Sequence, residues 1–300
     1  MVRINISIII SSLIAASFGV QAAVSVFACE PEWASLTKAI GGTHVRVVSA
    51  THARQNPHYI RARPSLIAAI RRAELLVCSG ASLEAGWLPV LLKRASSELQ
   101  PGGVGYLMAT DHVAVLETPT TVDRSMGDVH PEGNPHVHLN PNNLIQIGRR
   151  IKEQLQKIDP DNKAVYAKRY ADFERQWAVA IQRWTVQAAP LRGQTVIVHH
   201  KSLSYLLDWL GINTLASLEP VPGLPPTASH LNTVLKDSSR QPVLAILRTP
   251  YDPSDASEWM ASKTRIPSVV VPYTVGGSDQ STDLKALFNH TIELLLMHGS

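Results

Sequence analysis

The chain is poor in cysteine, in net charge and in long apolar runs. It has two cysteines in 300 residues, which excludes a small fold held together by several disulfides. Beyond residue 22 no run of about 18 apolar residues occurs, so we expect no integral membrane protein. The formal net charge is +4 and the basic residues are scattered, which predicts solvated faces and no nucleic-acid partner.

Residues 1–22 have the composition of an export signal. Arg3 gives a short basic start, residues 4–20 are mainly apolar, and Val20-Gln21-Ala22 offers small residues for a peptidase cut. An amino-terminal membrane anchor is the alternative, but the polar residues within the stretch favour cleavage. We therefore expect a periplasmic protein, without a lipid because no cysteine stands at the cut.

The two cysteines lie close to the ends of two apolar runs. Cys29 follows residues 24–28, and Cys78 follows residues 75–77. If these runs were neighbouring strands, an oxidising periplasm would permit a disulfide between them. Two buried thiols packed as small apolar side chains are equally compatible with the pattern, and the sequence leaves the choice open.

Short apolar runs alternate with amphipathic segments along the chain. This alternation predicts an α/β fold in which helices cover both faces of a parallel sheet. In the first half we predict strands at 24–28, 45–50 and 75–78, helices at 32–40 and 64–72, and a helical region at 83–99 that Pro89 interrupts. In the second half we predict strands at 195–198, 212–218, 243–247 and 268–271, and helices at 202–210, 228–237, 254–264 and 283–297.

A much longer helix separates the two halves. Asn140-Pro141 is a typical helix start, and we expect one helix from there to residue 158 and a second over 162–188. About 27 helical residues would span roughly 40 Å, more than the width of one sheet. We predict two Rossmann-like lobes, residues 23–160 and 190–300, joined by a linking helix at 161–189.

Three histidines stand where such a fold places its ligands. His58 and His136 each complete an Asn-Pro-His triplet, and His200 ends a predicted strand. Parallel α/β sheets bind ligands beyond the carboxyl ends of their strands, so the histidines can meet in a cleft between the lobes. Neutral imidazoles favour Zn²⁺, and a carboxylate would close the site; we predict Asp279, in a glycine-rich loop, for that position. Mn²⁺ or Fe²⁺ could use the same four ligands.

Neighbouring residues offer alternatives to this set. His138 would share a side with His136 in an extended segment, whereas His199 and His200 point to opposite sides. We therefore treat His138 and His199 as alternative ligands or as residues that support the ligands. Glu219, Asp252 and Asp283 compete with Asp279 for the carboxylate position. The histidines without a convergent partner are expected at the surface: His44, His52, His112, His130, His230 and His290.

These features resemble the zinc and manganese receptors of ABC importers. The resemblance covers nearly the whole chain after residue 22. It implies two α/β lobes, His58, His136, His200 and Asp279 as metal ligands, and a membrane permease with its ATPase as partners. Two features depart from the family: His138 stands where a bulky residue is frequent, and a long histidine-rich loop is missing. The residues that carry the resemblance are Pro57-His58, the run 134–141, His200-Lys201-Ser202, Tyr205 and Asp279.

The sequence thus predicts a binding protein and not an enzyme. We expect a monomer that captures Zn²⁺ with high affinity, with Mn²⁺ or Fe²⁺ as the alternative cargo. A secreted zinc hydrolase would need an open coordination position and a general base, and no His-Glu-x-x-His helix is present. A metal-dependent adhesin could use the same fold, but nothing in the sequence indicates an adhesive patch.

Overall fold

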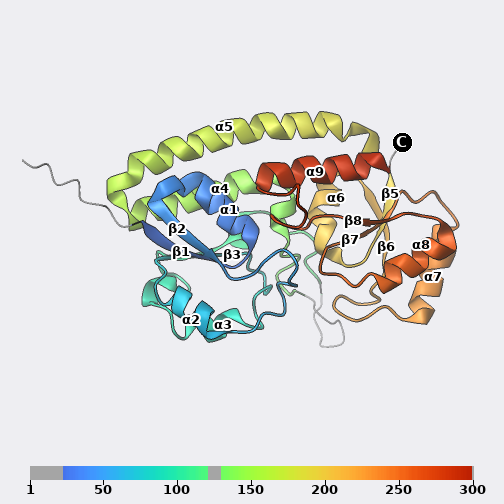
Figure 1. Ribbon diagram of the computed structural model, residues 1–300, viewed down its shortest axis with the longest axis horizontal. Coiled ribbons are helices and arrows are strands. Elements are labelled where there is room, and N and C mark those ends of the chain that lie inside the picture. The colour runs from blue at the N-terminus through green and yellow to red at the C-terminus, as the bar shows by residue number, and fades with distance from the viewer. Residues whose placement is uncertain (1–22, 121–129, 299–300) are drawn as a thin grey trace, which may run out of the picture.

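The computed structural model describes residues 23–120 and 130–298. Two lobes lie side by side along the molecule, and helix α5 (Lys163–Gln187) runs across both of them (Figure 1). The predicted export signal, residues 1–22, lies outside the described residues. Within the described ranges, no helix is both long and apolar enough to cross a membrane.

The first lobe contains a parallel sheet in the order β2-β1-β3-β4. Its central strands β1 and β3 consist almost wholly of buried apolar residues, as expected for a sheet covered on both faces. Its strands are β1 (Val24–Ala28), β2 (Val45–Ser49), β3 (Leu75–Cys78) and β4 (Tyr106–Met108), and its helices α1 (Pro31–Gly41), α2 (Pro64–Ile70) and α3 (Leu88–Leu92).

Two details of this lobe differ from the sequence prediction. The helix predicted over 83–99 shrinks to α3 and a 3-10 turn at Ser97–Leu99, because Ala81 and Ser82 adopt positive φ and Pro89 restricts the start of α3. Strand β4 was not predicted, since its three residues are too short to show a period of their own.

The second lobe repeats the same strand order, as β6-β5-β7-β8. The prediction that both halves follow one α/β plan is therefore confirmed. The left-handed Gly211 ends α6 with φ of 68°. The strands are β5 (Thr195–Val198), β6 (Asn213–Ser217), β7 (Ile246–Arg248) and β8 (Ser268–Val270), and the helices α6 (Ser204–Leu210), α7 (Ala228–Ser238), α8 (Asp255–Thr264) and α9 (Leu284–Met297).

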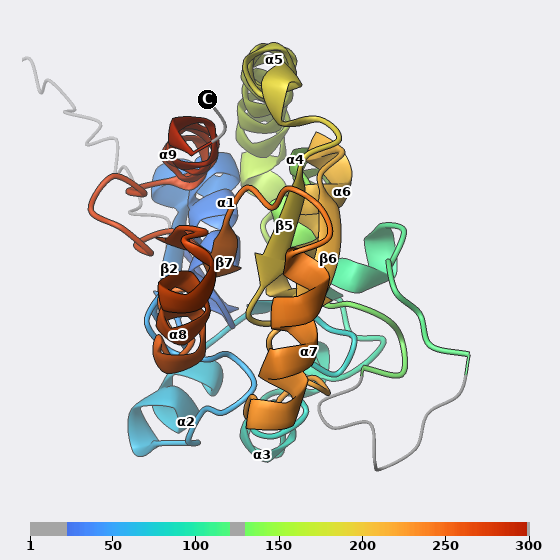
Figure 2. The same cartoon turned by 90° about the vertical axis from the view of Figure 1, so that its right-hand side faces the viewer.

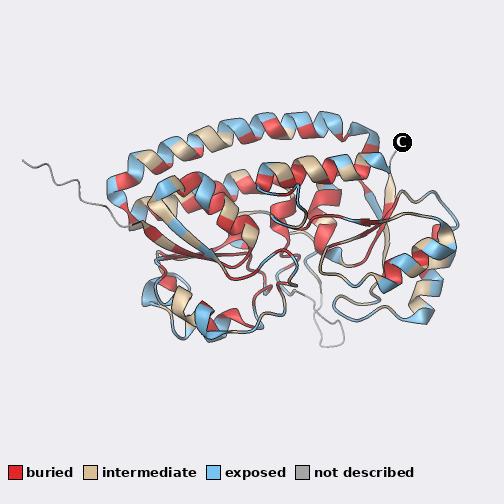
Figure 3. Cartoon of the chain, in the orientation of Figure 1, coloured by how far each residue is buried: buried red, intermediate tan, exposed pale blue. Residues whose placement is uncertain are grey.

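Helices α4 (Pro141–Ile158) and α5 tie the lobes together. An aromatic stripe on α5, including Trp177 and Trp184, is buried, and Trp184 stacks on Phe288 of α9. Seen along the molecule, α5 and α9 lie on one side and α2, α3 and α7 on the other (Figure 2). One apolar cluster runs from the first sheet beneath α5 into the second lobe. Figure 3 shows buried residues on the central strands and on the helices packed against them. This shared burial opposes wide separation of the lobes.

The two cysteines form a disulfide between neighbouring strand ends. Cys29 and Cys78 have Cα atoms 4.8 Å apart, because β1 and β3 pair in parallel and Ala28 lies opposite Val77. The choice that the sequence left open is thus resolved in favour of the bond.

Candidate metal centre

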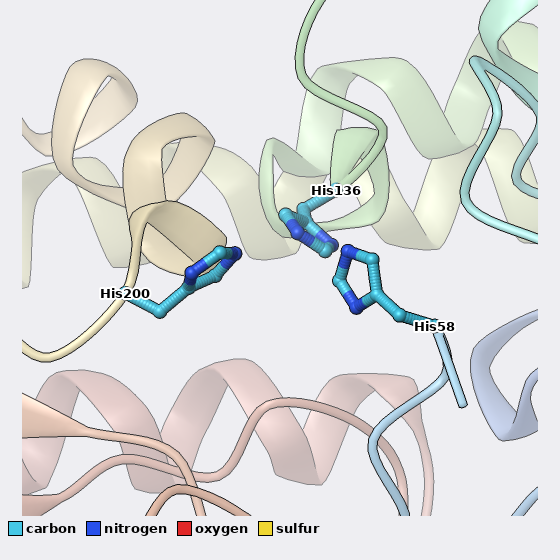
Figure 4. A group of neighbouring side chains, drawn as sticks. All are labelled: His58, His136 and His200. Carbon is cyan, nitrogen blue, oxygen red and sulfur yellow. The ribbon is translucent and has the colours of Figure 1, made fainter. Parts of the chain in front are cut away.

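His58, His136 and His200 come together between the lobes (Figure 4). One ring nitrogen from each lies within 4.8 Å of those of the other two. The ring centroids are 5.7 Å apart for His58 and His136, 5.8 Å for His58 and His200, and 6.0 Å for His136 and His200. His136 is 1% exposed, and the side chain of His200 is 11% exposed. Two ligand candidates come from the first half of the chain and one from the second.

The loop after β2 carries His58. Trp87 donates its indole N–H to the Pro57 carbonyl at 2.9 Å, which fixes the loop on the first lobe. The Asn56 side-chain oxygen accepts the backbone N–H of His58 and lies 2.7 Å from its Nδ1. Because this oxygen can only accept, Nδ1 carries the proton, and Nε2 is left with its lone pair.

His136 stands just before the 3-10 turn Val137–Leu139, which leads into α4. The Asn134 side chain accepts the backbone N–H of His136. The His136 Nδ1 lies 2.7 Å from the Tyr273 hydroxyl, and its Nε2 is buried without a hydrogen-bond partner among the described residues. A buried nitrogen of this kind is costly unless something occupies it, as a metal would.

His200 follows β5 and is held by a carboxylate. Its Nδ1 lies 2.6 Å from Oε2 of Glu219, which also accepts the Gly223 N–H at 2.9 Å. Burial raises the pKa of Glu219, but the interactions with His200, Gly223 and His199 together outweigh burial and bring that pKa below its usual value. All three histidines thus engage Nδ1 with an oxygen, which is how metal-binding imidazoles are oriented with Nε2 towards the ion.

Burial also keeps two of these imidazoles neutral. It lowers the pKa of His58 and of His136 well below 6.5, and the neighbouring imidazoles lower both further. Since a metal competes with protons for the same lone pair, a neutral ring is the form ready to bind. The site therefore suits a soft or borderline divalent cation at neutral pH.

His130 is a further member of this neighbourhood that the sequence did not reveal. Its Nε2 lies 3.1 Å from Nε2 of His58, and its ring centroid is 6.4 Å from that of His136. The expectation that His130 stands at the surface without a partner is wrong. Its loop has no helical or strand period, so periodicity could not predict where the side chain would lie. The alternating potential ligands Asp128, His130 and Glu132 were the one signal in the sequence that pointed to metal binding here.

Asp279 lies outside the group. Its side chain is exposed, on a loop turned by Gly276 at φ of 84°, and the Gly276 N–H donates to the Ser281 carbonyl. The loop therefore closes on itself at the surface and does not bring Asp279 to the histidines. The carboxylate that contacts them is Glu219, through His200. A ligand role for Asp279 stays a prediction.

The two neighbouring histidines point elsewhere. His138 places Nδ1 3.2 Å from Oε1 of Glu32 and Nε2 2.9 Å from the Tyr273 carbonyl. The expectation that it could share a side with His136 assumed an extended segment, whereas the 3-10 turn rotates it away. His199 is buried, with Nε2 3.9 Å from Oε1 of Glu219, and it does not belong to the group formed by His58, His136 and His200.

Residues 26–296 match the family described as zinc-uptake complex component A, periplasmic. The chain belongs to this family. The predicted family is thus confirmed, and it is a family of uptake-complex components rather than of enzymes.

Relatives within the family are named for different metals. The chain is 25% identical over 198 residues to the high-affinity zinc uptake system protein ZnuA of Yersinia pestis, covering 60% of each chain. It is 28% identical over 138 residues to the manganese ABC transporter substrate-binding lipoprotein scaA of Streptococcus gordonii, covering 45% of this chain and 42% of that one. The matches to these curated relatives span less than two thirds of their length.

Solved structures share the fold. A crystal structure of ZnuA superposes with a TM-score of 0.75 at 21% identity, covering 91% of this chain and 99% of that one. The Mn-bound periplasmic metal binding protein from candidatus liberibacter asiaticus gives 0.74 at 16% identity, covering 92% and 99%. The predicted two-lobed α/β fold is confirmed by these matches.

Proposed function

We propose that this protein captures a divalent transition metal in the periplasm and delivers it to an ABC importer, with His58, His136 and His200 as ligands. The observation that carries the proposal is the meeting of three imidazoles whose Nδ1 atoms are each engaged by an oxygen. Nε2 of His136 has no hydrogen-bond partner among the described residues, and Nε2 of His58 contacts a fourth imidazole, that of His130. The partners would be a membrane permease and its ATPase, and the protein would act as a monomer.

Zinc is the cargo that this donor set favours. Zn²⁺ accepts three imidazoles at about 2.0–2.1 Å in a tetrahedral site, and for a given set of nitrogen ligands it binds more tightly than Mn²⁺ or Fe²⁺. Manganese or iron is the alternative cargo, although both prefer sites with more oxygen ligands than three imidazoles provide. A carboxylate that bound through both oxygens would shift the preference towards them.

Two side chains compete for the fourth position. The predicted ligand Asp279 would have to move inwards with its loop. His130 already lies next to His58, with their Nε2 atoms 3.1 Å apart. Two nitrogens bound to one tetrahedral zinc lie about 3.3 Å apart, given bonds of about 2.0–2.1 Å. The spacing of His58 and His130 therefore supports His130, and the two candidates can be compared by experiment.

The test is elemental analysis and metal titration of the chain that begins at residue 23. We expect one zinc per chain, and in His200→Ala an affinity lower by more than about 100-fold, because even losing a group that supports a ligand costs 10- to 100-fold. The exposed His298 provides the control: His298→Ala should bind like the unmodified protein.

The same titration assigns the fourth ligand. If His130 closes the site, His130→Ala weakens zinc binding and Asp279→Ala does not; the reverse result assigns Asp279. A His200→Ala variant that kept full stoichiometry and affinity would refute the proposed site.

A further inference from the structure

Two consecutive residues of the second lobe make three polar contacts with buried side chains of the first. Tyr273 and Thr274 follow β8 and are each 2% exposed. The Tyr273 hydroxyl lies 2.7 Å from Nδ1 of His136, and the Tyr273 carbonyl lies 2.9 Å from Nε2 of His138. The Thr274 hydroxyl donates to Oε2 of Glu32 on α1. One short segment thus contacts α1 and the turn before α4 together.

The contact with His136 bears on metal capture. A metal can bind Nε2 of His136 only when the proton is on Nδ1, and that proton then needs an acceptor in a buried site. The Tyr273 hydroxyl oxygen is at hydrogen-bond distance to accept it.

We propose that Tyr273 is a positioning residue for metal capture: from the second lobe, its hydroxyl holds the His136 ring of the first lobe with Nε2 towards the centre. The inference rests on the proposed function, because it assigns a role within that same site. Its consequence is that the first lobe cannot orient His136 alone. The second lobe then contributes twice, through His200 directly and through Tyr273 by way of His136.

The packing around Tyr273 allows the hydroxyl to be tested separately from the ring. The ring meets His136, His138 and Tyr251 edge-on, with centroids 5.4, 4.8 and 5.4 Å apart. Phenylalanine would keep these three contacts and remove the oxygen alone. The Tyr273→Phe variant therefore isolates the hydrogen bond. A matched control is Tyr251→Phe, which also deletes a buried hydroxyl of the same lobe but one that none of the site histidines contacts.

The first measurement is zinc affinity by competition titration on the full chain after residue 22. We expect Tyr273→Phe to bind one zinc about 10- to 100-fold more weakly, the range found when a partner of a metal-bound histidine is removed. Tyr251→Phe should bind like the wild type. Equal affinity of Tyr273→Phe and wild type overturns the proposal. So does an equal loss in both variants, which would reflect general loosening of the core.

The second measurement is nuclear magnetic resonance of nitrogen-labelled imidazoles, which reads the tautomer directly. In the zinc-loaded wild type, the His136 Nδ1 proton should be present and slow to exchange; in Tyr273→Phe it should exchange faster. A fast-exchanging His136 Nδ1 proton in the wild type overturns the proposal without any variant. Absence of zinc binding by the wild type would instead refute the proposed function, so the two failures are distinguishable.

Discussion

The two lobes place different side chains at equivalent positions of two sheets that share one strand order. The N–H of Cys29 donates to Val77 at the end of β1, and the N–H of His199 donates to Leu247 at the end of β5. Glu30 and His200 come next in the two lobes. The carboxyl end of the central strand therefore carries a disulfide and a buried acid in the first lobe, and a candidate ligand in the second.

The neighbouring strand extends this correspondence. The N–H of Thr51 donates to the Cys29 carbonyl, just as the N–H of Glu219 donates to the His199 carbonyl. Thr51 turns its hydroxyl back to the Cys29 carbonyl, whereas Glu219 holds His200. One topology thus serves two purposes. In the first lobe a disulfide and the Thr51 hydrogen bond occupy these strand ends, and the candidate ligand histidines of this lobe lie on loops.

Removing the disulfide of the first lobe should have the largest effect, and this effect should be on stability and not on metal binding. The bond closes a sequence separation of 49 residues, which in the chain-entropy model is worth about 4 kcal/mol. We expect the double variant Cys29→Ala, Cys78→Ala to lose about that much free energy of unfolding, measured in urea without metal. Zinc affinity under native conditions should not change. A loss below about 1 kcal/mol would contradict the stabilising role of this strand end.

Removing Glu219 from the second lobe should instead weaken metal binding. Without its carboxylate, His200 loses the acceptor that orients Nδ1, so Glu219→Ala should weaken zinc binding by about 10- to 100-fold. Glu219→Gln keeps an acceptor oxygen and should lose less. Titration with a competing chelator checks both variants. If Glu219→Ala bound zinc as tightly as the wild type, the strand end of the second lobe would have no role in metal binding through Glu219.

The smallest expected effect is a change in how stability depends on pH. Burial, then the charges of Glu84 and Glu32, raises the pKa of Glu30 well above 4.5, and burial raises the pKa of Glu84 to about 7. The folded state therefore keeps protons that the unfolded chain releases above 4.5. This contribution to stability is complete below pH 4.5 and is lost as pH rises through the raised pKa values, of which that of Glu84 is about 7.

Glu30→Gln should reduce that loss, because the amide cannot ionise and the strongly raised pKa of Glu30 no longer contributes. Urea unfolding of variant and wild type at about pH 4.5 and about pH 7.5 measures the difference, and the histidines, which act in the opposite direction, cancel in the comparison. The exposed Glu258 supplies the control, Glu258→Gln. Parallel stability curves for Glu30→Gln and wild type would contradict a buried acid at this strand end.

Local patterns predicted most of the fold. Runs such as those of β1 and β3 are apolar throughout, and the aromatic stripe of α5 recurs at helical spacing, so both are visible in a short window. Three histidines could be predicted to converge because each follows a feature with a known place in the fold, a strand end or an Asn-Pro turn. The predicted domain boundaries, residues 23–160, 161–189 and 190–300, stay predictions.

The rest of the site depends on contacts between distant segments. His130 reaches His58 from a loop without periodicity, and the self-closing turn at Gly276 decides that Asp279 faces solvent. His138 turns away because the segment is a 3-10 turn stabilised by Tyr273 from the other lobe. The positions of His130 and His138 are thus set by partners far away in sequence, which no local pattern encodes, whereas Asp279 is set by the local geometry of a glycine turn.

The amino-acid composition of α5 limits how the lobes can move. Between Lys163 and Gln187 the helix contains neither proline nor glycine, the residues at which sharp kinks usually form. It therefore has no built-in joint. Any movement of one lobe against the other has to be absorbed as slight bending or twisting spread over roughly 38 Å of helix. Such a connection behaves as a stiff spring, which returns the lobes to one relative position once the force that displaced them is gone.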